Sequence, residues 1–467
     1  MISLTAEEIA KITGGTLHQL DAHAIISQIP IIDSRQATDQ TFFVAFKGEN
    51  VDGNDYAESA IANGARFALV ERACDGPCIV VPNAGIALMK LSKAVRDRLT
   101  NLSVIAITGS QGKTTAKDLL KHILEIVGPT VATQASLNNE IGLPLTLLRC
   151  TESTRFCIVE MGARHIGDIA QLVEIANPNI GCVLVVGRAH IGEFGSRENI
   201  AAAKSELISH LGPNSVAVLG NYDEFTPLMS QGLGLRSVQF GEKSSCAVRA
   251  ADIELREGRA HFDLVTPAGR AAVGLQLLGL HQISNALAAA AIATELSVPI
   301  DVIASALSTA EPSSKWRMEL HDQQGILLIN DAYNANPESM VAAIRTLALL
   351  SQERGGLSWA FLGKMAELGA SEAQEHAEIG RLIYEVGIDH LVCVGTKAYA
   401  PPEEVQNFMS REYGDETTVH YCDSIADAAV LASHITSGDV VLVKASRSVH
   451  LDLLADQLLG AWQVTSE

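Results

Sequence analysis

Apolar runs of strand length alternate with longer stretches of helical spacing in the middle of the chain, between residues 99 and 236. The four strongest runs are SVIAITG, RFCIVEMG, GCVLVVGRAH and SVAVLGN. This alternation is typical of a parallel sheet whose faces are covered by helices. From about residue 237 the apolar segments follow one another closely, which predicts an antiparallel addition to that sheet. These segments are SVQFG, AVRAADIEL and HFDLVT.

Shorter α/β patterns flank this middle region on both sides. At the start, Thr5 and Glu8 fit a capping box and Gly14 follows, so a short helix is predicted between them. Near residue 312 a polar, proline-containing stretch marks a boundary, and beyond it strands and helices alternate again in a Rossmann-like layout. The predicted organisation is α/β with three domains, at residues 1–98, 99–312 and 313–467.

The composition agrees with three globular domains. A length of 467 residues, with 47% hydrophobic and 19% charged positions, suffices for several cores. Domains of about 150 residues are the usual size. The formal charge of −20 argues against a nucleic-acid binder, because such proteins need a basic face. An anionic ligand would depend on local lysines, arginines and backbone amides.

Targeting and redox features predict a cytoplasmic protein. The sequence does not reveal the oligomeric state, and a monomer is the default expectation. The first residues lack a cationic stretch followed by an apolar core, and no run of about 18 apolar residues occurs, so stable membrane insertion is not expected. Among eight cysteines only Cys74 and Cys78 lie close, without a second pair or a nearby histidine. A zinc site is therefore the weaker interpretation, and reduced thiols are the default.

The stretch VIAITGSQGKTTAKDLLKHIL joins an apolar strand to a helix through a glycine-rich turn. Backbone N–H groups at a helix start carry partial positive charge, and glycines let that backbone approach a phosphate. The predicted roles fall on Gly109 and Gly112 for the turn, Lys113 for the terminal phosphates, and Thr114 or Thr115 for a hydroxyl to Mg²⁺. Position 107 carries isoleucine instead of the usual glycine, so an ordinary strand-to-helix turn is the alternative. We interpret it as a variant ATP-type site.

Three polar residues beyond the turn are candidates for holding a metal and a carboxylate. Glu160 ends an apolar strand at the edge where parallel sheets bind ligands, and a carboxylate there can hold Mg²⁺; a solvated edge glutamate is the alternative. His190 comes just past the next strand, which places it beside Glu160. Lys204 has the helical spacing of a solvated residue. Near a metal, however, a lysine with a depressed pKa can react with CO₂ to give an anionic carbamate ligand.

Eight segments, in order, resemble the Mur ligase family, the ATP-dependent amide-bond-forming enzymes of peptidoglycan precursor synthesis. They are TGSQGKTT, SLNNEIGLP, EMG, GRAHIGEFGS, AAAKSEL, LGLHQISNALAAAAIA, DAYNANPESM and VLVKASRS. The resemblance covers nearly the whole chain and implies a phosphate loop of the short T-G-x-x-G-K-T/S form, so Ile107 fits the pattern. It also implies ATP and Mg²⁺ as cofactors and a three-domain layout.

Two segments narrow the resemblance within the family. YNANPESM and FLGKMAELG look like the members that join D-alanyl-D-alanine to UDP-N-acetylmuramoyl-tripeptide. Those members usually carry an acidic residue where Lys364 stands. Relatives that add a diamino acid usually have an Asp-Asn-Pro-Arg stretch, which does not occur in this sequence. The third residue of the tripeptide stays open between lysine and a diaminopimelate.

Carried over position by position, the resemblance implies the remaining site residues. The uridine-nucleotide pocket falls on Ser34, Arg35 and the segment 48–56, in which Asn54 stands where members often have histidine. The ATP site falls on Gly109, Ser110, Gln111, Gly112, Lys113, Thr114, Thr115, Asn285 (adenine), Arg317, Asp331, Tyr333 and Asn334. The substrate side falls on Asn138, Asn139, Asn336, Lys444, Ser446 and Arg447. Lys204 matches the carbamylated lysine, so the implied metal ligands are Thr114, Glu160, His190 and Lys204.

The implied reaction begins with attack of the peptide carboxylate on the γ-phosphate of ATP. The resulting acyl phosphate is attacked by the D-alanyl-D-alanine amine, while Lys113 and Mg²⁺ offset the phosphoryl charge. Domain closure would exclude water. Folylpolyglutamate synthetase is the nearest rival, but it lacks a uridine-binding first domain. A phosphate-loop switch or motor ATPase would not need DAYNANPESM or the pair of His190 and Lys204.

Overall fold

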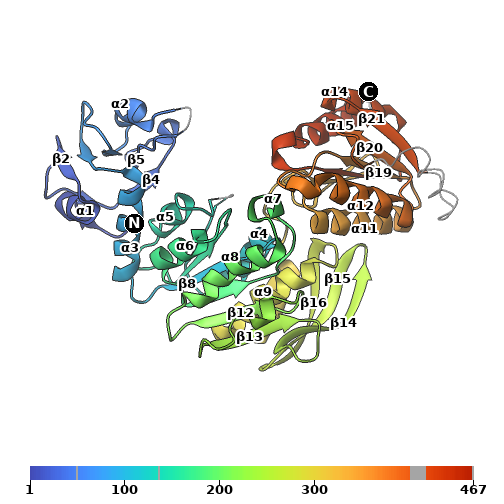
Figure 1. Ribbon diagram of the computed structural model, residues 1–467, viewed down its shortest axis with the longest axis horizontal. Coiled ribbons are helices and arrows are strands. Elements are labelled where there is room, and N and C mark those ends of the chain that lie inside the picture. The colour runs from blue at the N-terminus through green and yellow to red at the C-terminus, as the bar shows by residue number, and fades with distance from the viewer. Residues whose placement is uncertain (49–50, 135–136, 400–416, 465–467) are drawn as a thin grey trace.

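The computed structural model describes residues 1–48, 51–134, 137–399 and 417–464. Positions 49, 50 and 136, which belong to segments named above, lie outside these ranges. Figure 1 shows three sheet-containing units in chain order, from the blue N-terminal unit to the orange and red C-terminal unit. In the described part of the chain, no helix has both the length and the apolar character needed to cross a bilayer.

The N-terminal unit contains a five-stranded sheet in the order β2-β7-β6-β5-β4, parallel except for β2. Its elements are β2 (Thr16–His18), β4 (Ile29–Ile31), β5 (Thr41–Val44), β6 (Ala68–Val70), β7 (Cys78–Val80), α1 (Ala6–Thr13), α2 (Ala57–Ala62) and α3 (Ala84–Arg98), with a small pair of β1 (Leu4–Thr5) and β3 (Ile25–Ile26). The predicted first helix is confirmed. Glu8 N donates to Thr5 Oγ1 at 3.1 Å, and Gly14 ends α1 with a left-handed φ of 71°.

The central unit contains a nine-stranded sheet in the order β16-β15-β14-β13-β12-β11-β8-β10-β9. The strands are β8 (Ser103–Thr108), β9 (Thr130–Ala132), β10 (Phe156–Glu160), β11 (Ile180–Val183), β12 (Val216–Gly220), β13 (Arg236–Gly241), β14 (Val248–Arg256), β15 (Arg259–Thr266) and β16 (Gly269–Leu278). Only the pairs β14·β15 and β15·β16 are antiparallel. The prediction of antiparallel strands from residue 237 is therefore wrong for β13, which runs parallel to β12. The connection through residues 221–235 is long enough for a crossover, which a parallel pair requires.

Helices cover both faces of the central sheet. Along β8, Val104 and Ala106 face one side while Ile105 and Ile107 face the other, because strand side chains alternate. The first side packs on α3, α5 (Gly142–Leu147), α6 (Asp168–Ala176) and α8 (Arg197–Ser209), and its core continues into the N-terminal unit. The second side packs on α4 (Lys113–Val127), α9 (Gln282–Glu295) and α10 (Ile300–Thr309). The short helix α7 (Ile191–Phe194) lies just before α8.

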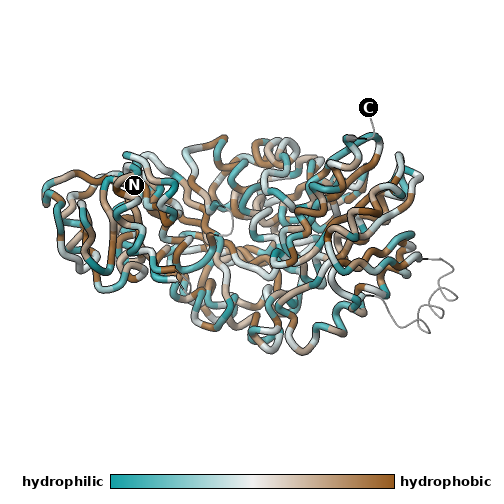
Figure 2. The backbone as a smooth tube through the Cα atoms, turned by 90° about the horizontal axis from the view of Figure 1, so that it is seen from above, coloured by the Kyte–Doolittle hydropathy of each residue, from teal (hydrophilic) through white to brown (hydrophobic). Residues whose placement is uncertain are grey.

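The C-terminal unit contains a six-stranded sheet in the order β17-β18-β22-β19-β20-β21, parallel except for β17. Its elements are β17 (Glu319–Gln323), β18 (Ile326–Asp331), β19 (Ser358–Leu362), β20 (His390–Val394), β21 (Thr418–Cys422), β22 (Val440–Lys444), α11 (Pro337–Arg354), α12 (Glu372–Glu385), α14 (Ile425–Ala429) and α15 (Asp452–Val464). In Figure 2, brown hydrophobic stretches run through the interior and teal hydrophilic ones lie on outer turns. The predicted α/β class is confirmed. The predicted domain boundaries fall just after α3 and after α10, and they stay predictions.

Candidate active site

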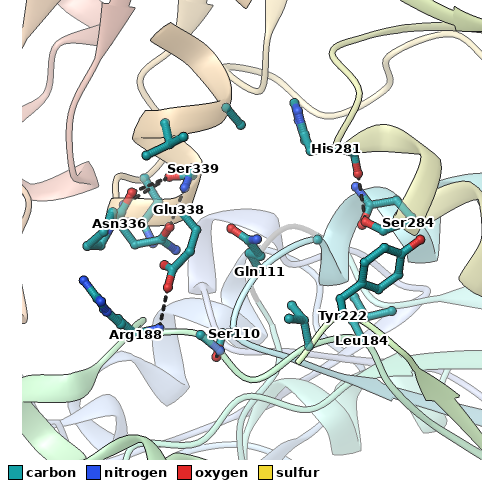
Figure 3. A pocket seen from close by; sticks show the side chains of 18 of the residues that line it. Ser110, Gln111, Leu184, Arg188, Tyr222, His281, Ser284, Asn336, Glu338 and Ser339 are labelled. Carbon is teal, nitrogen blue, oxygen red and sulfur yellow. Dashed lines mark hydrogen bonds between the residues drawn. The ribbon is translucent and has the colours of Figure 1, made fainter. Parts of the chain in front are cut away.

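A cavity of about 1030 Å³ lies between the strand ends of the central sheet and helices α11 and α12 of the C-terminal unit. Ligands of parallel α/β sheets usually bind at this carboxyl edge. In Figure 3, His281 and Tyr222 lie on one side of the cavity and Arg188 and Glu338 on the other, with Gln111 between them. The predicted site residues that line it are Ser110, Gln111, Gly112, Lys113, Thr114, Thr115, Asn138, Glu160, His190, Asn285, Arg317, Asp331, Tyr333, Asn334, Asn336 and Lys444.

The glycine-rich turn joins β8 to α4 at the floor of this cavity. Gly112 has a φ of 81°, and a Cβ there would come within 2.1 Å of Asn285 Oδ1 on α9, so only glycine fits. Lys113 Nζ donates to Gly109 O at 2.7 Å, which holds the ammonium over the turn. Burial lowers the pKa of Lys113, although the carboxylate of Glu160 opposes this effect. Free N–H groups at a helix start beside an ammonium suit a phosphate.

Glu160 is the last residue of β10 and is almost completely buried. Thr114 Oγ1 donates to its Oε2 at 3.3 Å, and Lys117 Nζ lies 3.9 Å from its Oε1. Within the described residues, Oε1 has no hydrogen-bond partner. Burial raises the pKa of Glu160, opposed by the nearby charges of Lys117 and Lys113. This site therefore holds a buried oxygen that accepts no hydrogen bond from the described residues.

Lys204 lies on α8 and is 3% exposed, which contradicts the solvated residue that periodicity alone suggests. Its amine forms no hydrogen bond or ion pair with any residue that the structure describes. Burial, reinforced by the positive charge of Lys113, lowers the pKa of Lys204 well below its ordinary value. This shift favours the neutral amine, which is the form that reacts with CO₂.

His190 lines the cavity but does not pair with Glu160 in this structure. Its Nδ1 lies 2.6 Å from Glu367 Oε2 of the C-terminal unit, an ion-pair distance without hydrogen-bond alignment. This contact lowers the pKa of Glu367, so the carboxylate stays charged. Over the described ranges, no three His, Cys, Asp or Glu side chains lie close enough together to hold a metal. A metal site here would need the threonine and lysine ligands as well.

Arg317 connects the C-terminal unit to the glycine-rich turn. Its Nη2 donates to Thr114 Oγ1 at 3.0 Å, and its guanidinium lies 3.9 Å from the ring centroid of Tyr333. The predicted residues on the two units therefore meet at one point of the cavity.

Lys444 lines the cavity wall, yet its ammonium is engaged within the protein. Nζ donates to Asp331 Oδ2 at 2.5 Å and to Asn334 O at 2.9 Å, and the side chain is 2% exposed. These three predicted residues thus form one network around the buried ammonium of Lys444.

Several predicted residues make structural contacts. Asn336 accepts a hydrogen bond from Ser339 N at 2.9 Å and so caps α11. The guanidinium of Arg447 lies 4.3 Å from the ring centroid of Trp316, outside the cavity lining. Asn139 Oδ1 accepts a backbone hydrogen bond at 3.1 Å at the start of α5. Ser446 Oγ accepts from Ala366 N at 2.8 Å.

The predicted uridine-pocket residues lie in the N-terminal unit, away from this cavity. Arg35 is exposed and pairs with Asp33 at 2.8 Å, and Ser34 precedes it in the same short 3₁₀ helix. Asn54 is buried. Its Nδ2 donates to Asp52 at 2.7 Å and its Oδ1 accepts from Glu71 N at 2.8 Å, so both ends of the amide are occupied.

The cavity residues that the sequence prediction did not assign include Arg188, Tyr222, His281, Glu338 and Glu375. Arg188 N donates to Glu338 Oε1 at 2.9 Å, and Arg188 Nη1 donates to Glu375 at 2.8 Å, which joins the two units. Burial lowers the pKa of His281 to about 4, so the ring is neutral. Tyr222 follows the end of β12, and the strand-end rule that selected Glu160 would have found it.

Comparison with known proteins gives three matches along the chain. Residues 29–101 match the Mur ligase family catalytic domain, residues 107–293 the Mur ligase middle domain, and residues 316–447 the Mur ligase glutamate ligase domain. The chain belongs to the Mur ligase family. The predicted family is therefore confirmed.

Relatives of this Mur ligase match over almost their whole length. It is 39% identical to the UDP-N-acetylmuramoyl-tripeptide–D-alanyl-D-alanine ligase of Mycobacterium tuberculosis strain H37Rv over 98% of each chain. It is 35% identical to the ligase of the same name from Escherichia coli K12 over 97% of each chain. Among solved structures, MurF from Acinetobacter baumannii superposes with a TM-score of 0.86 at 34% identity, covering 98% of this chain and 99% of that one. MurF from Thermotoga maritima in complex with ADP gives 0.79 at 27% identity, covering 94% and 99%.

Proposed function

We propose that this Mur ligase joins D-alanyl-D-alanine to UDP-N-acetylmuramoyl-tripeptide through an acyl phosphate, releasing ADP and phosphate, in peptidoglycan precursor synthesis. The full-length identity to ligases of that name carries the assignment. The cavity supports the same function. Arg317 of the C-terminal unit donates to Thr114 at the start of the phosphate-loop helix, so residues of both units would meet a nucleotide bound there.

Nucleotide binding is assigned to the turn 109–115 together with residues of the C-terminal unit. Lys113 and the N–H groups at the start of α4 would hold the β- and γ-phosphates. Asn285 packs against Gly112 and would lie at the base of the nucleotide. A similar structure is in complex with ADP, which supports nucleotide binding.

The residues around Glu160 fit a divalent cation. Glu160 Oε1 is buried without a hydrogen-bond partner among the described residues, and Thr114 Oγ1 lies 3.3 Å from Oε2. The neutral amine fraction of Lys204 suits conversion to a carbamate. We assign Thr114, Glu160, His190 and carbamylated Lys204 to Mg²⁺. When bound, Mg²⁺ offsets the negative charge of the phosphates and carboxylate that meet there.

The protein's own groups supply positioning and charge during the reaction. Lys113 stabilises the charge on the transferred phosphoryl group, and Arg317 adds a second cation from the other unit. The tripeptide carboxylate is held in line with the γ-phosphate, so little acid–base catalysis is needed. Enclosure between the units keeps water from the acyl phosphate.

The remaining assignments follow the three units. The N-terminal unit, about residues 1–98, would hold the uridine nucleotide through Ser34 and Arg35. Residues 99–312 would bind ATP, and residues 313–467 would close over it and bind D-alanyl-D-alanine. The cytoplasmic location and the monomeric state stay predictions.

ADP release by the purified protein tests the function. With UDP-N-acetylmuramoyl-tripeptide and ATP, we expect release to require D-alanyl-D-alanine and to match the amount of pentapeptide product found by mass spectrometry. Release that ignores the dipeptide would indicate an ATPase and contradict the ligase assignment.

A matched pair of lysine variants on α4 tests the phosphate loop. Lys113→Ala should lower kcat by about 10²- to 10³-fold, because a preorganised cation at the transferred group is lost. Lys121→Ala removes the same charge from the exposed face of the same helix, where Lys121 pairs with Glu125 at 3.4 Å. Lys121→Ala should leave kcat unchanged. Equal effects of the two variants would argue against the assigned role of Lys113.

A further inference from the structure

The segment 363–371, which follows β19 and includes most of FLGKMAELG, lies directly against α7 of the central unit. Gly192 N donates to Glu367 O at 2.9 Å. A Cβ on Gly192 would come within 2.7 Å of Gly369 N, and a Cβ on Gly369 within 2.9 Å of Gly192 Cα. The two backbones are therefore in direct contact, and glycine is needed on both sides.

This contact brings Glu367 to His190. Nδ1 of His190 and Oε2 of Glu367 are 2.6 Å apart. Both residues adopt left-handed backbone conformations, with φ of 62° at His190 and 63° at Glu367. Such conformations are unfavourable for side-chain-bearing residues and persist only where the surrounding structure imposes them, often at functional sites.

The position of the carboxylate has a chemical consequence for the imidazole. A carboxylate beside Nδ1 favours the tautomer that carries its proton on Nδ1, which leaves the lone pair on Nε2. A carboxylate in contact with one ring nitrogen also limits how far the ring can rotate. Glu367 therefore prepares His190 to bind a cation through Nε2.

The same loop of the central unit is held by the C-terminal unit at a second place. Arg188 N donates to Glu338 Oε1 at 2.9 Å, and Arg188 Nη1 donates to Glu375 Oε1 at 2.8 Å. Residues 188–192 are thus held on both sides of His190 by a different unit from their own. The orientation of His190 consequently depends on how the two units dock.

We propose that Glu367 is a positioning residue that orients His190 for the Mg²⁺ site, so that docking of the C-terminal unit completes this site. The inference rests on the proposed function and adds a role for FLGKMAELG. It predicts that loss of the Glu367 carboxylate weakens cation binding only through His190.

A double-mutant cycle of Glu367→Ala and His190→Asn tests whether Glu367 acts through His190 or only by holding the two units together. Asparagine is used at position 190 because it tolerates the left-handed backbone. Two quantities are measured for each variant: kcat for ADP release with both substrates, and Mn²⁺ affinity in the presence of ADP by electron paramagnetic resonance. Glu367→Ala should lower each by about 10- to 100-fold. In the His190→Asn background it should add less than about a twofold change.

Two further variants complete the test. Glu367→Gln keeps an acceptor oxygen without the charge and should lose less than Glu367→Ala; it replaces Glu367→Ala in the cycle if that variant does not fold. Glu372→Gln neutralises a neighbouring carboxylate that pairs with Lys364 at 2.9 Å, and should behave as wild type.

Wild-type Mn²⁺ affinity and kcat in Glu367→Ala would overturn the inference. Losses that multiply in the double variant would also overturn it, because Glu367 would then act by docking alone. If the wild type couples no dipeptide, the proposed function fails, while the Mn²⁺ measurements still decide the role of Glu367.

Discussion

Replacing Lys444 with methionine tests the ion pair that Lys444 forms with Asp331 in the cavity wall. Lys444 ends β22 and pairs in register with Asp331, the last residue of the parallel strand β18. Its Nζ lies 2.5 Å from Asp331 Oδ2 and donates to Asn334 O at 2.9 Å. Methionine keeps an unbranched apolar stem and removes the ammonium. The perturbation therefore leaves a buried carboxylate without its cation.

The expected cost follows from the burial of the pair. The side chains of Lys444 and Asp331 are 2% and 13% exposed. After the substitution, Met318 N at 3.1 Å is the remaining donor to Asp331 in the described part of the chain. Removing one partner of a buried ion pair costs about 3–5 kcal/mol in the free energy of unfolding. Adding Asp331→Asn neutralises the stranded charge, so the double variant should regain roughly half of that loss.

Tryptophan fluorescence during urea unfolding measures this effect selectively. The chain has three tryptophans, Trp316, Trp359 and Trp462, and all of them lie in the C-terminal third of the sequence. With an m-value of about 2 kcal/mol/M, the midpoint of Lys444→Met should fall by roughly 1.5–2.5 M. Lys364→Met is the matched control, because Lys364 is half-exposed in a surface pair and should shift the midpoint by less than about 0.5 M.

Two results would refute this reasoning. The first is a midpoint for Lys444→Met within about 0.5 M of wild type, which would mean that water or another group stabilises Asp331. The second is a double variant that loses the sum of the two single losses, which would show that the charges are not coupled.

Three further predictions concern the central unit. Gly112→Ala should raise the KM for ATP at least about 10-fold, since its Cβ would meet Asn285 Oδ1 at 2.1 Å; an unchanged KM contradicts this. Lys204→Ala should nearly abolish dipeptide coupling, and full activity would remove the carbamate from the mechanism. Burial lowers the pKa of His281 to about 4, so acid favours the unfolded state, where the ring protonates near pH 6.5. Stability should therefore fall from pH 6.5 to 4 by at most about 3 kcal/mol on this account. In thermal unfolding, His281→Gln should lose less stability than wild type over this pH range. An equal loss in both proteins would show that His281 does not cause the pH dependence.

The sequence alone predicted the elements whose signals are local. The capping box at Thr5, the strand-turn-helix around Lys113 and the acidic strand end at Glu160 each depend on residues within a few positions of one another. Alternation of strands and helices likewise predicted the α/β class, because hydrophobic periodicity reports which side of an element is buried. The same logic failed at β13, since the spacing of strands along the chain does not reveal in which direction the next strand runs through the sheet.

Only the tertiary structure decided which of these residues meet. Arg317 reaches Thr114 across 203 positions, and Lys444 reaches Asp331 across 113. The burial of Lys204 likewise depends on tertiary packing, and the contact between Glu367 and His190 depends on how two units pack. Such contacts produce no periodic pattern in the sequence. Their free energy comes from desolvation and charge pairing between groups that only the packed fold brings within a few ångströms.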